Sequence, residues 1–231
     1  ADPVLQSGST YRYAFTGSFS NEGMIEVEFR KNSFANLLGT QSLTEYEQFF
    51  VRVDGTTLDQ APVAVIKSAG SGSAVNSDVF NSKGYIDISF AGLDGSAIDP
   101  ATIDRNDFIL SGTGVRDAEL STKTPQQINE STWRYFFVDG NATNETDLFG
   151  EGEVVFSFST GAIEADGVDN FAFREAVVID NTLAPTRSGS NPISVVPLTL
   201  EGPSIGIADF GFSEGSIIIT VSLGVDTGSL A

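Results

Sequence analysis

The sequence contains no cysteine and no histidine, and its 12 lysines and arginines face 31 aspartates and glutamates. The absence of both residue types excludes disulfide bonds, thiolate metal sites, and Ser-His-Asp or Cys-His catalytic groups. Two carboxylates could still hydrolyse a glycosidic bond, but no pair stands out, so we predict no enzymatic activity. The formal net charge of -19 repels phosphate and anionic lipid. We therefore expect no nucleic-acid partner and regard cations as natural ligands.

Long hydrophobic runs are also absent. No apolar stretch approaches the roughly 18 residues that a membrane-spanning helix needs, so we predict no membrane insertion. Amphipathic helical spacing is equally hard to find. The sequence instead alternates, as in 25–29, where Ile, Val and Phe are separated by two glutamates. This period of two, with clusters of Gly, Asn, Asp and Ser between the strands, predicts an all-β protein of antiparallel β-sandwiches.

Two segments of the sequence occur twice. Residues 9–13 read Ser-Thr-Tyr-Arg-Tyr and residues 131–135 read Ser-Thr-Trp-Arg-Tyr, and each copy is followed by Glu-Gly and an alternating strand. A second similarity relates residues 84–90 to residues 215–221, and each of these is followed by a Gly-x-Asp turn. Repeats of this kind indicate modules arranged in a row.

The order of the repeats predicts one complete module and two partial ones. Residues 1–57 correspond to the second half of a module, 58–183 to a complete module, 184–203 to a linker, and 204–231 to the first half of a module. Half a sandwich would leave an apolar face uncovered and strand edges unpaired. We therefore expect the two terminal halves to complete one sandwich. Pairing within one chain is possible, because the linker is long enough to pass a sandwich, and pairing between chains would build a filament.

Short motifs resemble those of a known family. Residues 179–186 read Ile-Asp-Asn-Thr-Leu-Ala-Pro-Thr, similar to the Val-Asp-x-Thr-x-Pro-Thr junction of bacterial immunoglobulin-like tandem repeats in large surface adhesins. Residues 107–111 look like the Asp-Phe-hydrophobic-Leu-Ser segment of the same group, whereas the first junction departs by an insertion around residues 58–60. The resemblance implies tandem immunoglobulin-like antiparallel β-sandwiches, located extracellularly or at the cell surface. It also implies that some junction and loop aspartates bind calcium and stiffen the array.

Three groups of side chains are candidate calcium ligands, because Ca²⁺ takes six to eight oxygen ligands from carboxylates and carbonyls. The groups are Asp54, Asp59, Asp180 and Asn181 at the junctions; Asp94, Asp99, Asp104 and Asp107; and Glu164, Asp166 and Asp169. None has the spacing of an EF-hand loop. The alternative is that these are turn residues, since Asp hydrogen-bonds to nearby backbone in turns.

Other conspicuous residues are given structural roles. Trp133 could stack on a sugar, but its alternation with Tyr135 and Phe137 predicts a place in the core. Arg12 and Arg134 fall on the opposite face of their strands, where we expect them to neutralise acidic neighbours. The Gly-Ser-Gly-Ser loop at residues 70–73 lacks the lysine of a phosphate-binding loop, and we expect it to connect a hairpin.

These observations predict a non-catalytic extracellular structural or adhesive module of a bacterial surface protein, stabilised by calcium, whose partners are neighbouring repeats or copies of itself. One alternative is a self-assembling filament or surface-layer subunit joined by its terminal half-modules. A second is a carbohydrate-binding accessory module, for which a surface glycan or a host or matrix ligand would be the partner.

Overall fold

The computed structural model describes residues 4–7, 10–16, 21–35, 41–52, 61–67, 74–92, 94–141, 147–183, 188–189, 193–195, 204–206 and 214–223 of the chain. Most of its regular elements are β-strands, and most of these pair in antiparallel fashion, so the prediction of an all-β protein is confirmed. Within these ranges, no helix has both the length and the apolar character needed to cross a membrane.

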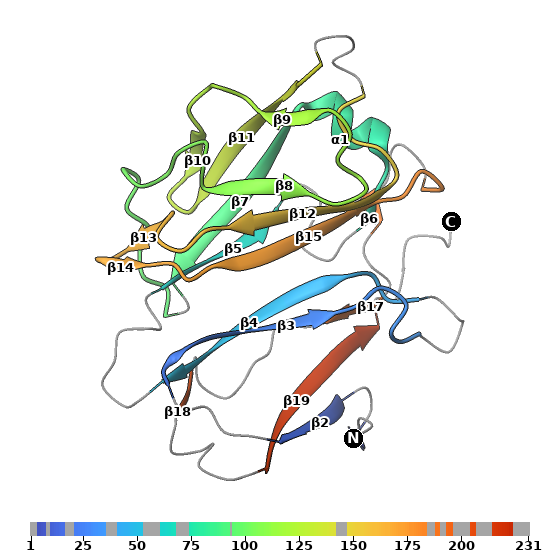
Figure 1. Ribbon diagram of the computed structural model, residues 1–231, viewed down its shortest axis with the longest axis vertical. Coiled ribbons are helices and arrows are strands. Elements are labelled where there is room, and N and C mark those ends of the chain that lie inside the picture. Colours follow the sequence, from blue (N-terminus) through green and yellow to red (C-terminus); the bar gives the residue numbers. More distant parts are fainter. Residues whose placement is uncertain are drawn as a thin grey trace, which may run out of the picture.

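Two five-stranded sheets occupy the middle of the chain, and we name them together the central unit (Figure 1). The first sheet has the order β10 (Gln126–Asn129), β11 (Thr132–Asp139), β7 (Tyr85–Gly92) and β5 (Pro62–Ile66), and β9 (Ala118–Leu120) also pairs with β11. The second has the order β16 (Ser188–Gly189), β6 (Ala74–Val75), β15 (Phe173–Ile179), β12 (Gly152–Phe158) and β8 (Phe108–Ser111). A small hairpin of β13 (Glu164–Ala165) and β14 (Val168–Asp169) follows β12.

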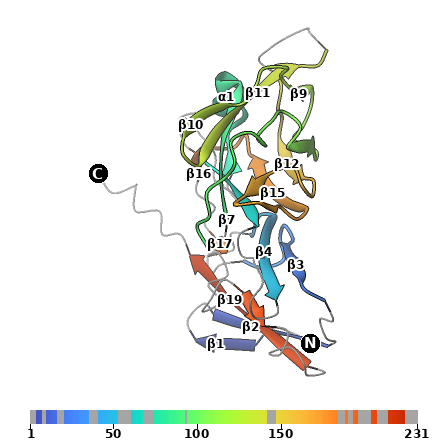
Figure 2. The same ribbon diagram turned by 90° about the vertical axis from the view of Figure 1, so that its left-hand side faces the viewer.

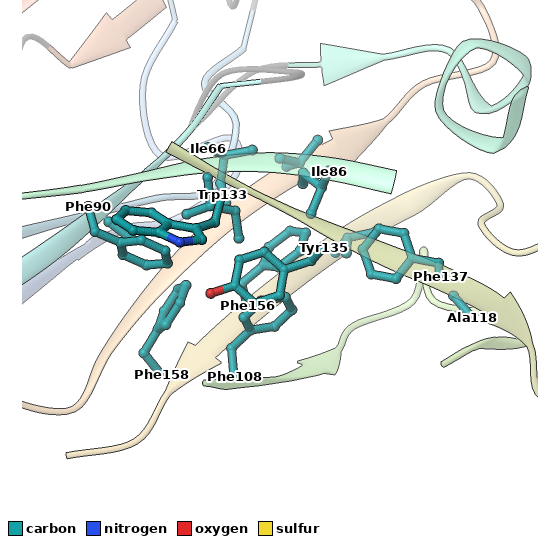
Figure 3. Packing of buried hydrophobic residues seen from close by; sticks show 14 of the residues in the cluster. Ile66, Ile86, Phe90, Phe108, Ala118, Trp133, Tyr135, Phe137, Phe156 and Phe158 are labelled. Carbon is teal, nitrogen blue, oxygen red and sulfur yellow. The ribbon is translucent and has the colours of Figure 1, made fainter. Parts of the chain in front are cut away.

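The core of the central unit lies between these two sheets and is rich in aromatic rings (Figure 3). Trp133 on β11 is only 2% exposed, which confirms its predicted place in the core. The ring of Phe108 from the facing sheet lies 5.0 Å from the ring of Tyr135 and 5.3 Å from that of Phe156, centroid to centroid. Removal of this apolar surface from water, at about 25 cal/mol per Å², is the main force holding the sheets together.

Strands from the two ends of the chain form two further sheets, which we name together the terminal unit. In a four-stranded sheet, β19 (Glu214–Leu223) lies between β2 (Thr10–Thr16) and β17 (Ile193–Val195), and β1 (Val4–Ser7) pairs with β2. In a three-stranded sheet, β4 (Glu45–Arg52) lies between β18 (Ser204–Gly206) and β3 (Gly23–Phe29). Figure 2 shows β1, β2 and β19 side by side. Two short strands, β16 and β17, fall within the predicted linker.

The described part of the chain also contains a short helix, α1 (Ser77–Lys83), which the sequence analysis did not predict. Asn76 caps its start by accepting the backbone N–H of Asp78, and Gly84 ends it in a left-handed conformation with φ of 60°. Seven residues are too few to show a helical repeat in the sequence, but Asn and Gly at the two ends are recognisable capping signals.

The prediction of a hairpin around residues 70–73 is wrong. β5 belongs to the first sheet of the central unit and β6 to the second, so the chain crosses from one sheet to the other between them. Residues 68–73 themselves lie outside the described residues. A run of glycine and serine marks a connection but does not specify which strands it joins. The sequence therefore gave no sign that β5 and β6 belong to different sheets.

Candidate functional site

A polar contact centred on Arg174 of β15 joins the central unit to the terminal unit. One carboxylate oxygen of Glu26, on β3, accepts the backbone N–H of Arg174 at 2.7 Å, and the other accepts its side-chain Nε–H at 2.8 Å. The amide of Gln48, on β4, donates to the backbone carbonyl of Arg174 at 3.0 Å. Two side chains of the terminal unit therefore hold both the backbone and the guanidinium of one residue.

These contacts cover an open strand edge. β15 pairs with β12 along one side, whereas on its other side β6 pairs only with Val178 and Ile179. The first half of β15 thus has no strand partner on that side among the described strands, and such an edge is prone to unwanted strand pairing. Figure 1 shows β3 and β4 running alongside this edge. Glu26 and Gln48 satisfy backbone groups that another strand would otherwise pair with.

Apolar packing surrounds the polar contact. Tyr46 on β4 forms a small buried cluster with Val155 and Ala176 on the outer face of the central unit. The guanidinium of Arg174 stacks on the Tyr46 ring, 4.3 Å from its centroid, which adds a cation–π interaction. The side chain of Glu26 is 18% exposed and that of Arg174 42%, so the charges are only partly desolvated. The contact between the two units thus combines an ion pair, hydrogen bonds and apolar packing.

A groove of about 450 Å³ also lies between the two units, at the end of β15 opposite Arg174, and is lined by residues of both. Lys31 and Gln41 contribute from the terminal unit, and Glu151 and Asp180 from the central unit. Asp180 was predicted as a junction ligand for calcium. Its Oδ1 accepts the backbone N–H of Thr182 at 2.8 Å and the hydroxyl of the same residue at 2.6 Å, so it already stabilises a local turn.

The loop aspartates predicted as calcium ligands mostly form turns. Asp94, Asp99 and Asp104 each accept the backbone N–H of the residue two positions further on, at 2.8, 2.9 and 2.6 Å. These contacts are the ones that favour Asp in turns. Among the described residues, no three acidic side chains gather in a way that could hold a metal ion. Asp54 and Asp59 lie outside those residues, and calcium binding stays a prediction.

Asp107 has a different environment. It is buried, and its carboxylate accepts the hydroxyl of Tyr135 and the backbone N–H of Asp104, the latter at 3.0 Å. Burial raises the pKa of Asp107 to about 7, and these two hydrogen bonds oppose the rise. The side chain links the loop before β8 to β11 across the core.

The β13–β14 hairpin adjoins the loop before β8. The backbone carbonyl of Glu164 accepts the N–H of Asp99 at 2.9 Å, and the Glu164 N–H donates to the hydroxyl of Thr102 at 3.2 Å. Glu164 and Asp169 are opposite each other in the β13–β14 hairpin, and Asp166 lies in its turn with a positive φ of 46°. Asn181 accepts the backbone N–H of Ser77 at 3.2 Å and so ties the end of β15 to the start of α1. Of these residues, Asn181 therefore links two elements of the central unit through its side chain.

Arg134 provides a comparison for the junction, because it has the same kinds of partner on the outer surface of a single sheet. It donates to both carboxylate oxygens of Asp87, at 2.8 and 3.0 Å, and stacks on Tyr85 at 3.7 Å. The prediction that Arg134 neutralises an acidic neighbour is confirmed. Since Trp133 is buried and Arg134 covers one face of Tyr85, neither ring is a free platform for a sugar.

The sequence alone did not indicate the contact that Arg174, Glu26 and Gln48 make between the units. Glu26 alternates with Ile25 and Val27, which predicts a solvent-facing side chain, and nothing local indicates that another sheet covers that face. One signal was available, since Arg174 and Glu175 interrupt an otherwise aromatic and aliphatic strand from Phe173 to Ile179. Comparison of the chain with protein-family models, with curated proteins and with solved structures finds no match.

Proposed function

We propose that this chain is a non-catalytic structural or adhesive segment of a bacterial extracellular protein, made of two immunoglobulin-like sandwiches docked in a fixed orientation. The observation that carries the proposal is the junction at Arg174, where Glu26 and Gln48 hold an exposed strand edge. Units joined only by a linker move freely unless their interface is specific. A junction of this kind limits bending, which is what a spacer requires.

The strand registers support two related sandwiches. Arg12 lies opposite Ile218 just as Arg134 lies opposite Asp87, and these positions correspond in the two sequence repeats. The β1–β2 and β10–β11 pairs also have matching registers, each with one irregularity at the same place. The parallel pairing of β18 with β4 likewise matches that of β6 with β15. The terminal unit is thus a second version of the central one, assembled from both ends of the chain.

The alternatives receive less support. A filament or surface-layer subunit requires the terminal strands to pair between chains, whereas β19 pairs with β2 of the same chain. A carbohydrate-binding module requires an exposed aromatic platform, and the single tryptophan is buried. The spacer is therefore the function that the geometry favours.

Spin-label distances test the fixed orientation. The chain has no cysteine, so labels can be placed at Val65→Cys on β5 and Arg12→Cys on β2, both exposed positions. We expect one narrow distance distribution, broadened by Arg174→Ala and unchanged by Arg134→Ala, because only the first substitution touches the junction. A distribution that is already broad without either substitution would contradict the spacer role.

Calcium stabilisation remains part of the proposal, and Asp180 in the groove between the two units is its best-placed candidate ligand. A ligand that binds only the folded state at 100 times its Kd adds about 2.7 kcal/mol to the free energy of unfolding. We therefore expect a higher melting temperature in calcium than in chelator, and a smaller difference in Asp180→Asn. Identical melting curves in calcium and in chelator would show that calcium does not stabilise the protein.

A further inference from the structure

One of the strand edges at which the terminal unit differs from the central unit is the edge of β3. In the central unit β12 has two neighbours, β15 and β8, whereas β3 pairs with β4 alone among the described strands. β3 and β12 correspond, because the β3–β4 and β12–β15 hairpins align over their whole length, from Gly23 and Gly152 to Phe29 and Phe158. The free edge of β3 is therefore the position that β8 takes in the central unit.

β8 contributes alternate side chains to the core of the central unit. Phe108 is buried, and its ring lies 5.3 Å from the rings of both Phe156 and Phe158. Leu110 packs against the same core, while Ile109 points outward and is 67% exposed. An extended segment with apolar residues at every second position is thus what this edge of a sandwich accepts.

The residues beside the free edge of β3 are less buried than their counterparts. Val154 and Phe156 on β12 are both 0% exposed, whereas the corresponding Ile25 and Val27 on β3 are only half-buried. The same holds for Tyr13 on β2, which is half-buried although its counterpart Tyr135 is fully buried. These less buried residues surround the position that corresponds to the ring of Phe108 in the central unit.

We propose that the edge of β3 binds an extended segment of the β8 type, donated by a neighbouring repeat and pairing in antiparallel fashion. With the register of β8 on β12, its Phe would lie opposite Phe29 and its Leu opposite Val27. The Asp that precedes the Phe would lie near Tyr13, the counterpart of the Tyr135 whose hydroxyl Asp107 accepts in the central unit. Such strand addition gives affinity through the backbone and specificity through alternate side chains. The inference rests on the proposed relationship between the two units.

A peptide with the sequence of residues 105–112, Arg-Asn-Asp-Phe-Ile-Leu-Ser-Gly, is the direct probe. Titrated as a labelled peptide against the full chain, it should bind saturably, as measured by fluorescence anisotropy. Changing Phe108→Ser in the peptide should weaken binding by about tenfold or more, because a buried ring is lost. Changing Ile109→Thr should have little effect, since that side chain faces outward. Absence of saturable binding, or equal binding of the Phe108→Ser peptide, would overturn the proposal.

Substitutions in the chain locate the binding edge. Val27→Asp on β3 should abolish peptide binding, whereas Val65→Asp, the same change at an exposed position on β5, should preserve it. Hydrogen exchange should show peptide-dependent protection of β3 amides. Protection of β12 amides instead, or protection of β3 by self-association without peptide, would contradict the inference. Failure of peptide binding leaves the spacer role intact, because that role is judged by the label distances.

Discussion

Two arginines with similar partners illustrate how the position of an ion pair decides what it stabilises. Arg134 and Asp87 lie on the outer surface of one sheet, 26% and 21% exposed, and their pair bridges two strands that the backbone ladder already joins. Arg174 and Glu26 instead join two units, and Glu26 also accepts a backbone N–H there. The same chemistry therefore supports a local surface in one case and the arrangement of the units in the other.

We expect Arg174→Ala to lower the free energy of unfolding by about 1–2 kcal/mol, because it leaves the half-buried Glu26 without its guanidinium. Arg134→Ala should cost less, because β7 and β11 remain joined by their own backbone ladder. Urea unfolding of both variants measures the difference. Equal losses would mean that the junction contributes no more than a surface pair.

The buried carboxyl of Asp107 makes stability depend on pH. Its pKa is about 7 in the folded state against an ordinary value of 3.8, so the folded state holds the extra proton between these two pH values. The contribution of this group to stability is fully present below about pH 4 and is lost as pH rises to about 7, with a slope of at most about 1.4 kcal/mol per pH unit.

Asp107→Asn keeps an acceptor for Tyr135 but cannot ionise, so its free energy of unfolding should fall less steeply between pH 4 and pH 7 than that of the wild type. Denaturant unfolding at several pH values tests this. Burial, and next the charge of Glu45, raise the pKa of Glu47 to about 8. The free energy of unfolding should therefore still decline toward pH 8 in both proteins. Parallel curves for the two proteins would show that Asp107 is not the group responsible.

At the scale of elements, strands were predictable where one face is wet. The alternation around Trp133 and Phe156 specified both the strands and their buried faces. Helix α1 was missed because seven residues carry too little periodicity, although its caps were visible. The contacts of Arg174 could not be predicted, because they depend on a sheet more than a hundred residues away in the sequence. The aspartates were read as ligands from composition, whereas the structure shows most of them bonded to neighbouring backbone.

Two glycines test how tightly the turns of the central unit are constrained. Gly84 has φ of 60° and nothing near the position of a Cβ, whereas Gly112 has φ of 105° and a Cβ there would lie 2.3 Å from the carbonyl oxygen of Glu153. We expect Gly84→Ala to cost about 1 kcal/mol for its left-handed backbone, and Gly112→Ala about 3 kcal/mol, because strain and a clash add. Thermal unfolding of the two variants measures these losses of stability. A smaller loss for Gly112→Ala than for Gly84→Ala would contradict the packing of β8 against β12.

At the scale of the whole molecule, strands from the two ends of the chain combine in the terminal unit. Strand β19 follows β2 from Thr16 to Thr10 in a continuous antiparallel register, and β18 joins β4 in the neighbouring sheet. The terminal unit then covers the open edge of β15. A chain built this way has its ends held together while its middle forms a complete unit, so loss of the β2–β19 pairing should also release the junction at Arg174.

The most direct test of this pairing is a disulfide between Ala14→Cys and Ser216→Cys, which lie opposite each other on β2 and β19 in a chain that has no other cysteine. Oxidised at low concentration, this variant should form the bond within one chain and keep a monomeric mass. The control pair Ala14→Cys and Thr220→Cys, which is out of register, should stay reduced. Dimers linked only between chains, or free thiols in the matched pair, would contradict the account.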